Sequence, residues 1–197
     1  MSKSKQVMFK YVVFLTVFIC YLTLSSYSQD IDFRTLSVDA GLSNFVVNDI
    51  AQDNNGFIWI ATEYGLNKYD GQNFKIYDKL HYPKLLNNWI NCIYVDKNNK
   101  IWLGTNGSGL IKFDPLLESF EVYSSHQNSP DSLKDNVIKD ICADDKNNLW
   151  IATSNGLFKF SIAEKKFKTF INEKIKRTLF LIILLTKYCS TLKVGFG

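Results

Sequence analysis

One framework of residues returns three times along this chain of 197 residues, and each copy is centred on a tryptophan. The three are Trp59, Trp102 and Trp150, which lie 43 and 48 residues apart. Self-similarity at such a period is typical of arrays built from one supersecondary unit, in which each unit buries its apolar face against its neighbours. The repeat therefore constrains the fold more than any other feature of the sequence.

Each tryptophan is surrounded by the same residue types at fixed distances. An Asp lies six residues before it, an Ile nine, another β-branched residue twelve and a Leu seventeen; a Thr follows three residues after it, and two aromatic residues come later. In this order, the members are Asp53, Asp96 and Asp144; Ile50, Ile93 and Ile141; Val47, Ile90 and Ile138; Leu42, Leu85 and Leu133; Thr62, Thr105 and Thr153; Tyr69, Phe113 and Phe160; and Phe74, Phe120 and Phe167.

Each copy divides into four short runs rich in β-branched and aromatic residues, which in the first copy are 47–51, 57–62, 65–69 and 74–77. Clusters of Asn, Asp and Gly separate the runs, and such clusters bound strands because they form tight turns. Four antiparallel strands per repeat are typical of one β-propeller blade. The sequence therefore predicts an all-β fold of about three blades of an incomplete propeller. The predicted blades span about residues 42–77, 85–123 and 133–170.

The tryptophans and the aspartates before them each have two possible roles. An exposed tryptophan can stack on a sugar ring, but these tryptophans are flanked by apolar residues, so we expect them to pack between blades. The link 53–56 reads Asp-Asn-Asn-Gly, which is hairpin chemistry. We therefore interpret Asp53, Asp96 and Asp144 as turn residues rather than as metal ligands or acids.

The pattern D-x-x-G-x-(I/L)-W-(I/L)-(G/A)-T-x-x-G-L resembles the two-component regulator propeller repeat. It reads DNNGFIWIATEYGL from Asp53, and in later copies Asn99 and Asn147 replace the glycine, a mild change because Asn also tolerates positive φ. The resemblance covers about residues 30–172. It implies the periplasmic sensor region of hybrid two-component sensor histidine kinases of Bacteroidetes-type bacteria, many of which sense oligosaccharides.

Residues 1–28 have the features of a signal peptide. Three lysines within the first ten residues precede the apolar run 11–24, and small residues follow before Gln29. The run is shorter than the ~20 residues that a membrane span needs, although an uncleaved anchor is the alternative. We therefore expect an exported, periplasmic protein that meets the membrane only through this signal.

Residues 29–172 form the predicted partial propeller, which opens with a lead-in strand at 33–36. Their net charge of about −3 does not provide the basic surface that nucleic acid requires. Residues 173–197 break the repeat, and we interpret them as an atypical tail that results from truncation or a frame shift. An open blade face then predicts that missing blades or a second chain are partners.

The sequence predicts no metal site, cofactor or catalytic arrangement. Cys92, Cys142 and Cys189 have no CxxC spacing, so we expect small buried residues, with a Cys92–Cys142 disulfide as the alternative. His81 and His126 stand alone in the connections between blades, where a solvent-exposed position is expected. We therefore expect that the chain is not an enzyme.

Ligands of propellers usually meet the face that carries the turns between the second and third strands. Trp89 precedes a predicted strand where the other copies have Val46 and Val137, so its ring could stack on a sugar or fill a gap between blades. The candidate ligand-binding residues are Glu63, Tyr64, Trp89, Asn106, Ser108, Ser154 and Asn155.

These features together predict a ligand-sensing propeller fragment of a hybrid two-component regulator, with oligosaccharides as ligands. No kinase motif is found in these 197 residues. Two alternatives remain open at this point: a fragment of an exported propeller enzyme, such as a lyase or glycosidase, and a scaffold for protein interactions.

Overall fold

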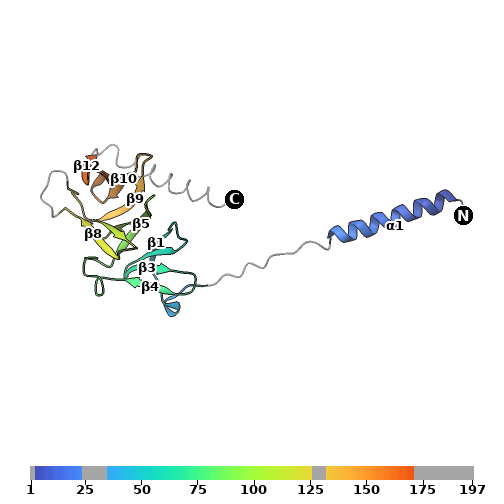
Figure 1. The fold of residues 1–197 in the computed structure, drawn as a ribbon, viewed down its shortest axis with the longest axis horizontal. Coiled ribbons are helices and arrows are strands. Elements are labelled where there is room, and N and C mark those ends of the chain that lie inside the picture. The colour runs from blue at the N-terminus through green and yellow to red at the C-terminus, as the bar shows by residue number, and fades with distance from the viewer. Residues whose placement is uncertain (1–2, 24–34, 126–131, 171–197) are drawn as a thin grey trace. The chain divides into compact units, whose positions relative to one another are not determined.

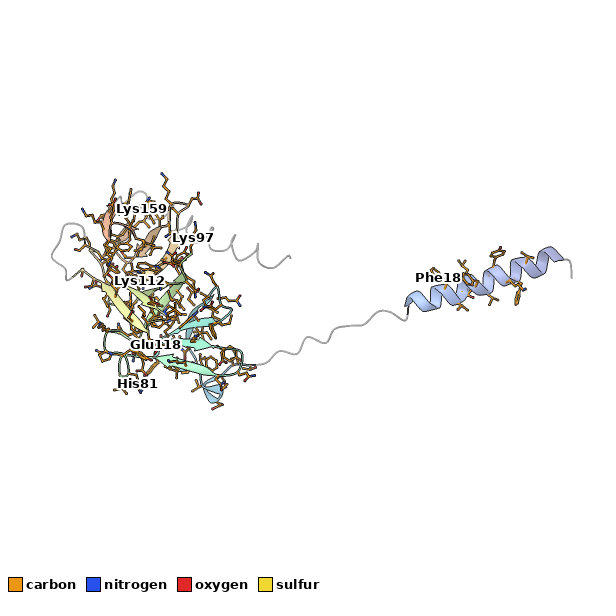
Figure 2. The ribbon with its side chains drawn as sticks, viewed as in Figure 1. Phe18, His81, Lys97, Lys112, Glu118 and Lys159 are labelled. Atoms are coloured by element: carbon orange, nitrogen blue, oxygen red, sulfur yellow. The ribbon has the colours of Figure 1, made fainter. Side chains whose placement is uncertain are left out.

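The computed structural model describes residues 3–23, 35–125 and 132–170. The helix α1 (Lys3–Thr23) belongs to a first unit that ends at Thr35, and the sheets belong to a second. Phe18 projects from α1 and is exposed (Figure 2). Among the described residues, no helix combines the length and the apolar character that crossing a membrane requires. The predicted cleavage before Gln29 lies outside the described residues.

The second unit contains, within the described residues, three antiparallel sheets of four strands each (Figure 1). Each sheet consists of four strands that are consecutive in the chain, so each is a blade. Blade 1 comprises β1 (Val47–Gln52), β2 (Ile58–Thr62), β3 (Gly65–Tyr69) and β4 (Phe74–Tyr77). Blade 2 comprises β5 (Ile90–Val95), β6 (Ile101–Thr105), β7 (Leu110–Asp114) and β8 (Ser119–Tyr123). Blade 3 comprises β9 (Ile138–Ala143), β10 (Asn148–Thr153), β11 (Gly156–Ser161) and β12 (Lys166–Phe170).

The predicted fold class is confirmed, and the four runs expected for the first copy match β1 to β4 within one residue at each end. A short 3-10 helix, η1 (Val38–Ala40), precedes blade 1. Of the predicted lead-in strand 33–36, the first two residues lie outside the described residues, and Thr35 and Leu36 form no strand. The predicted tail 173–197, Cys189 and His126 also lie outside the described residues.

The aspartate of each repeat closes the first hairpin of its blade. Oδ1 of Asp53 accepts hydrogen bonds from the amides of Asn55 and Phe57 at 2.9 and 3.1 Å, and the corresponding bonds recur at Asp96 and Asp144. The interpretation as turn residues is confirmed. The left-handed residue of this hairpin is Gly56 (φ 87°) in blade 1, Asn99 (φ 58°) in blade 2 and Asn147 (φ 62°) in blade 3.

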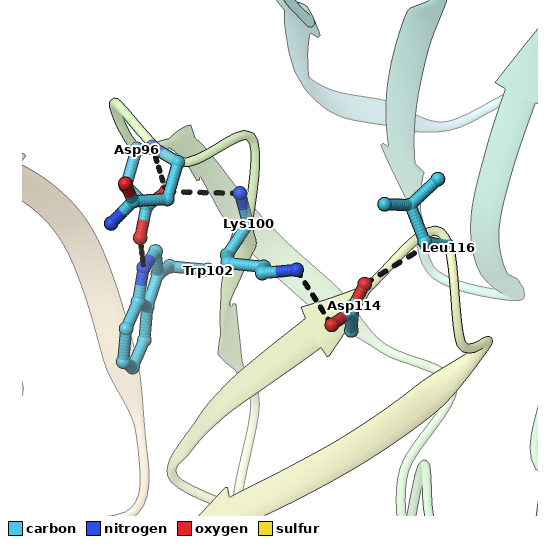
Figure 3. Close-up of polar contacts among 6 residues, drawn as sticks. Asp96, Lys100, Trp102, Asp114 and Leu116 are labelled. Atoms are coloured by element: carbon cyan, nitrogen blue, oxygen red, sulfur yellow. Dashed lines mark hydrogen bonds and ion pairs between the residues drawn. The ribbon is translucent and has the colours of Figure 1, made fainter.

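In blades 1 and 2 the second oxygen of the aspartate accepts the indole N–H of the tryptophan, whereas in blade 3 Oδ2 of Asp144 pairs with Nζ of Lys159 at 2.8 Å. Oδ2 of Asp96 accepts the indole N–H of Trp102 at 2.9 Å, and Asp53 does the same for Trp59 at 2.8 Å. In blade 2 the hairpin is tied further to the next turn, because Nζ of Lys100 donates to Asp114 at 2.6 Å (Figure 3). The bond from Lys100 lowers the pKa of Asp114, so this carboxylate remains ionised.

Each tryptophan of the first two blades packs against the next blade. Trp59 lies 5.7 Å from the ring of Phe113, and Trp102 lies 5.6 Å from Phe160, both with edge-to-face geometry. Both tryptophans are completely buried, which confirms the expected packing role and excludes sugar stacking for them. Trp150 differs: it is half-buried and contacts Phe170 of its own blade, because no described blade comes after it.

The first strands of the three blades are joined by side-chain bonds to backbone carbonyls. Nδ2 of Asn48 donates to the carbonyl of Ile90 at 2.8 Å, and Nδ2 of Asn91 donates to the carbonyl of Ile138 at 2.7 Å. Cys92 is buried nearby on β5, and it is not joined to Cys142. The alternative of a disulfide is therefore wrong. Each blade docks on the next through apolar packing and through polar contacts at equivalent positions.

Candidate ligand-binding face

The turns β2–β3, β6–β7 and β10–β11 are held in one shape by the repeated threonine. Its hydroxyl donates to the carbonyl of a glycine that begins β3 in blade 1 and directly precedes β7 in blade 2: Thr62 to Gly65 at 3.0 Å, and Thr105 to Gly109 at 2.8 Å. Thr153 makes the same bond in blade 3 at 2.9 Å. The threonine therefore fixes the backbone of each turn from within.

Six of the seven predicted ligand-binding residues occupy these turns, whereas Trp89 lies directly before β5, and their exposure differs. Tyr64 and Trp89 are the large exposed side chains, with 61% and 41% of their surface accessible. Ser154 and Asn155 are also exposed, whereas Glu63, Asn106 and Ser108 are half-buried. Trp89 belongs to neither of the large buried clusters between blades, so its indole offers an accessible ring.

The structure brings several of these residues into one continuous row, which we call the blade 2–3 rim: Trp89, Asn106, Val137 and Ser154. The amide of Asn106 donates to the carbonyl of Trp89 at 3.0 Å, and Asn106 pairs with Val137 in an antiparallel bridge. The amide of Ser154 donates to the carbonyl of Val137 at 3.2 Å. Glu63 and Tyr64 lie on the equivalent turn of blade 1 and enter none of these bonds.

Three further polar residues support the rim, and none of them was among the residues predicted from the sequence. Oδ1 of Asn87 accepts the amide of Trp89 at 3.0 Å while its Nδ2 donates to the carbonyl of Asn106 at 2.6 Å. Asp135 accepts the amide of Asn155 at 2.9 Å, and the carbonyl of Asn136 accepts the amides of Gly107 and Gly109. A signal was present: the residue fifteen before the tryptophan is Asn, Asn and Asp in the three copies.

Ion pairs staple neighbouring blades together at the opposite end of the strands. Glu118, labelled in Figure 2, lies on the β7–β8 turn. It pairs with Lys75 of blade 1 and accepts the hydroxyls of Tyr77 and Tyr82 at 3.2 and 3.0 Å. The bond from Lys75 lowers the pKa of Glu118, and burial raises the pKa of Tyr77 to about 12. The carboxylate is therefore charged and the phenol neutral at pH 7, as the hydrogen bond requires.

The staple between blades 2 and 3 has the opposite polarity. Lys165, on the β11–β12 turn, takes the place of Glu118, and Nζ of Lys165 donates to Glu121 of β8 at 2.6 Å. Glu121 in turn takes the place of Lys75. Each junction therefore carries one matched pair, and a blade cannot exchange position with its neighbour without placing like charges together.

His81 and the acidic side chains of the described residues do not form a metal site. His81 is exposed, as expected, and its Nδ1 lies 2.9 Å from Oδ1 of Asp78. Within residues 3–23, 35–125 and 132–170, no group of three or more His, Cys, Asp or Glu side chains could hold a metal ion. The blade 2–3 rim combines an exposed indole with backbone and side-chain polar groups, and it is the candidate surface for a small molecule.

Known sequences and structures identify the repeat. The profile of the "Two component regulator propeller" family matches residues 41–64, 84–107 and 132–155, one segment in each blade. The three blades are two-component regulator propeller repeats. Over 67 residues, a third of this chain, the sequence is 40% identical to "Histidine kinase P4" of Formosa agariphila.

Two solved structures have the same arrangement of blades. The extracellular domain of a hybrid two-component system of B. thetaiotaomicron is 34% identical, with a TM-score of 0.65 over 72% of this chain. A second such domain from that organism is 22% identical, with a TM-score of 0.58 over 76% of this chain, and shows the fold alone. The chain spans 5% of the Formosa kinase, and 20% and 22% of the two extracellular domains.

Proposed function

We propose that this chain is the ligand-sensing part of a periplasmic sensor in a hybrid two-component system, and that its ligands are oligosaccharides. The 34% identity to an extracellular domain of such a system supports the sensing role. Export is supported by the lysines and apolar run of residues 1–28. Histidine kinase activity would belong to other parts of such a system, and we propose that this chain is itself not an enzyme.

The observation that carries the oligosaccharide proposal is the position of Trp89. Its backbone is held on both sides, by Asn87 at its amide and by Asn106 at its carbonyl, while its ring remains 41% exposed. An accessible indole on a backbone held in place, beside amide and hydroxyl groups, suits a sugar, whose ring stacks on the aromatic face and whose hydroxyls exchange hydrogen bonds. The aliphatic side chains of Val46 and Val137 offer no such surface in the other blades.

The test is calorimetric titration of the full chain with a panel of neutral and uronate-containing oligosaccharides. We expect saturable binding of at least one member, at least tenfold weaker in Trp89→Ala. The control is Leu116→Ala. Leu116 is 85% exposed on the β7–β8 turn, which lies at the other end of β7 from the rim. This variant should bind like the wild type.

Chromatography of the same mixtures separates sensing from catalysis. Unchanged oligosaccharides after incubation support a sensor, whereas shortened or unsaturated products would show the lyase or glycosidase alternative to be correct. Failure of every oligosaccharide to bind would favour a scaffold and contradict the proposal. For export, the N-terminal residue of the protein recovered from the periplasm should be Gln29.

A further inference from the structure

The two outer faces of the three-blade array carry the two halves of an interface that the chain already forms twice. We propose that two copies of this chain associate head to tail, with blade 3 of one copy packed on blade 1 of the other. The proposal concerns assembly and does not depend on the identity of any ligand.

The first half is a pair of aromatic rings on the side of each blade that faces the next blade. In blade 1 the pair is Trp59 and Tyr77, with ring centroids 5.8 Å apart, and in blade 2 it is Trp102 and Tyr123, 6.1 Å apart. Blade 3 presents the same pair at the equivalent positions, Trp150 and Phe170, 5.2 Å apart. Here the pair is incompletely covered, since Trp150 is half-buried and Phe170 is 40% exposed.

The second half is a ring pair on the opposite side of each blade, which receives the first. Phe113 and Phe120 lie 4.5 Å apart in blade 2, and Phe160 and Phe167 lie 4.5 Å apart in blade 3. Blade 1 has Tyr69 and Phe74 at these positions, already paired at 4.7 Å and half-buried. The receiving rings of blade 1 are therefore arranged as in the two formed interfaces.

The first strand of blade 1 exposes side chains whose equivalents are buried. Val47 and Ile50 are 41% and 59% exposed, whereas Ile90 and Ile93 in blade 2 are at most 5% exposed, and the corresponding pair in blade 3 is equally buried. Burying apolar area stabilises by about 25 cal/mol per Å², so covering these side chains favours association. A second copy brings the surface that fits them, namely the Trp150 side of blade 3.

Polar contacts of the formed interfaces are retained in part. Lys139 takes the place of Asn48 and Asn91, so a nitrogen donor remains where those amides bond to the next first strand. Two other positions differ. In each formed interface, an asparagine oxygen accepts a backbone amide, and Phe45 stands at the equivalent position of blade 1. Gln72 of blade 1 would lie opposite Lys168 of blade 3, whereas the two formed interfaces have an ion pair there. The contact between copies is therefore weaker than the internal ones, and reversible.

A head-to-tail contact makes a prediction that a symmetric one does not. Ile50→Lys blocks only the blade 1 face, and Phe170→Lys blocks only the blade 3 face. In sedimentation velocity at ~100 µM, the wild-type full chain should be a dimer or larger, and each variant alone should be monomeric. An equimolar mixture of the two should form a heterodimer, because one intact face of each kind remains. Leu116→Lys, on a turn outside both faces, should associate like the wild type.

A variant that associates more tightly provides a test that loss of folding cannot mimic. Gln72→Glu provides a carboxylate opposite Lys168, as Glu118 does opposite Lys75, and should tighten the association about two- to fivefold in low salt. Adding Lys168→Glu to it should remove the gain. The proposal is wrong if the wild type is monomeric at 100 µM. It is equally wrong if both blocked variants associate like the wild type, if Phe170→Lys alone still self-associates, or if Gln72→Glu has no effect.

Discussion

Replacing Gly104 by alanine tests how closely the inner strands of blades 2 and 3 pack. Blades 1 and 3 have Ala61 and Ala152 at this position, so alanine is compatible with the strand itself. At Gly104, however, a Cβ atom would lie 2.4 Å from Sγ of Cys92 and 2.6 Å from Cγ2 of Ile138. Non-bonded heavy atoms need about 3.5–4.0 Å, so one strand has to move by about 1 Å.

The expected loss of stability results from two opposing effects. Overpacking a close-packed core costs about 1–3 kcal/mol, and removing a glycine from a strand recovers about 0.5–1 kcal/mol. We expect Gly104→Ala to lower the free energy of unfolding by about 1–2 kcal/mol, measured by urea denaturation followed by tryptophan fluorescence at unchanged m-value.

The neighbour responsible can be identified by a double-mutant cycle. Cys92→Ala removes the sulfur that the new methyl group would meet, so Gly104→Ala should cost at least about 1 kcal/mol less in that background. The residual cost then comes from Ile138 on β9. The reasoning is refuted if Gly104→Ala is as stable as the wild type, or if its cost is the same with and without the Cys92 thiol.

Three further changes have definite expected results. Asn147→Gly should raise stability by about 1 kcal/mol in thermal melts, because the buried Oδ1 of Asn147 lacks a hydrogen bond and the residue has φ 62°; unchanged or lower stability would contradict this. Burial alone would raise the pKa of Asp144, but the bond from Lys159, together with other hydrogen bonds, holds it well below its usual value. The lowered pKa of Asp144 contributes stability that is present above about pH 4 and is lost as the pH falls. Lys159→Met should therefore flatten the dependence of the free energy of unfolding on pH between about pH 4 and pH 2. A pH profile like that of the wild type would contradict this prediction. Lys75→Glu should cost about 0.5–1 kcal/mol in low salt, and adding Glu118→Lys should restore it; a double variant no more stable than the single one would show that the pair is not a staple.

Much of the fold was predictable because packing in a blade array depends on residues at constant distances from the tryptophan. The carboxylate of Asp96, for example, accepts hydrogen bonds from the hairpin backbone and from the indole of Trp102 at the same time. The spacing of six residues between Asp96 and Trp102 therefore cannot vary. The burial of Trp150 was less predictable, since it depends on the neighbour that covers the outer side of blade 3 and not on the repeat itself.

The ion-pair staples were hidden for a different reason. Lys75 and Glu121 occupy equivalent positions with opposite charges, so aligning the repeats shows no shared residue type there. The constraint acts on the pair, and each partner lies more than 40 residues from the other. The turn residues of the rim could be predicted from the order of the strands. The role of Asn87 could not, because it depends on hydrogen bonds to backbone groups that only the structure shows.

Contacts between aromatic rings test the central claim that equivalent blades stack in sequence order. In an NMR experiment on the full chain, the indole protons of Trp59 should show nuclear Overhauser effects to the ring of Phe113, and those of Trp102 to the ring of Phe160. Both indole N–H groups should be protected from exchange. Effects to unrelated rings, or one protected and one freely exchanging indole, would contradict the account.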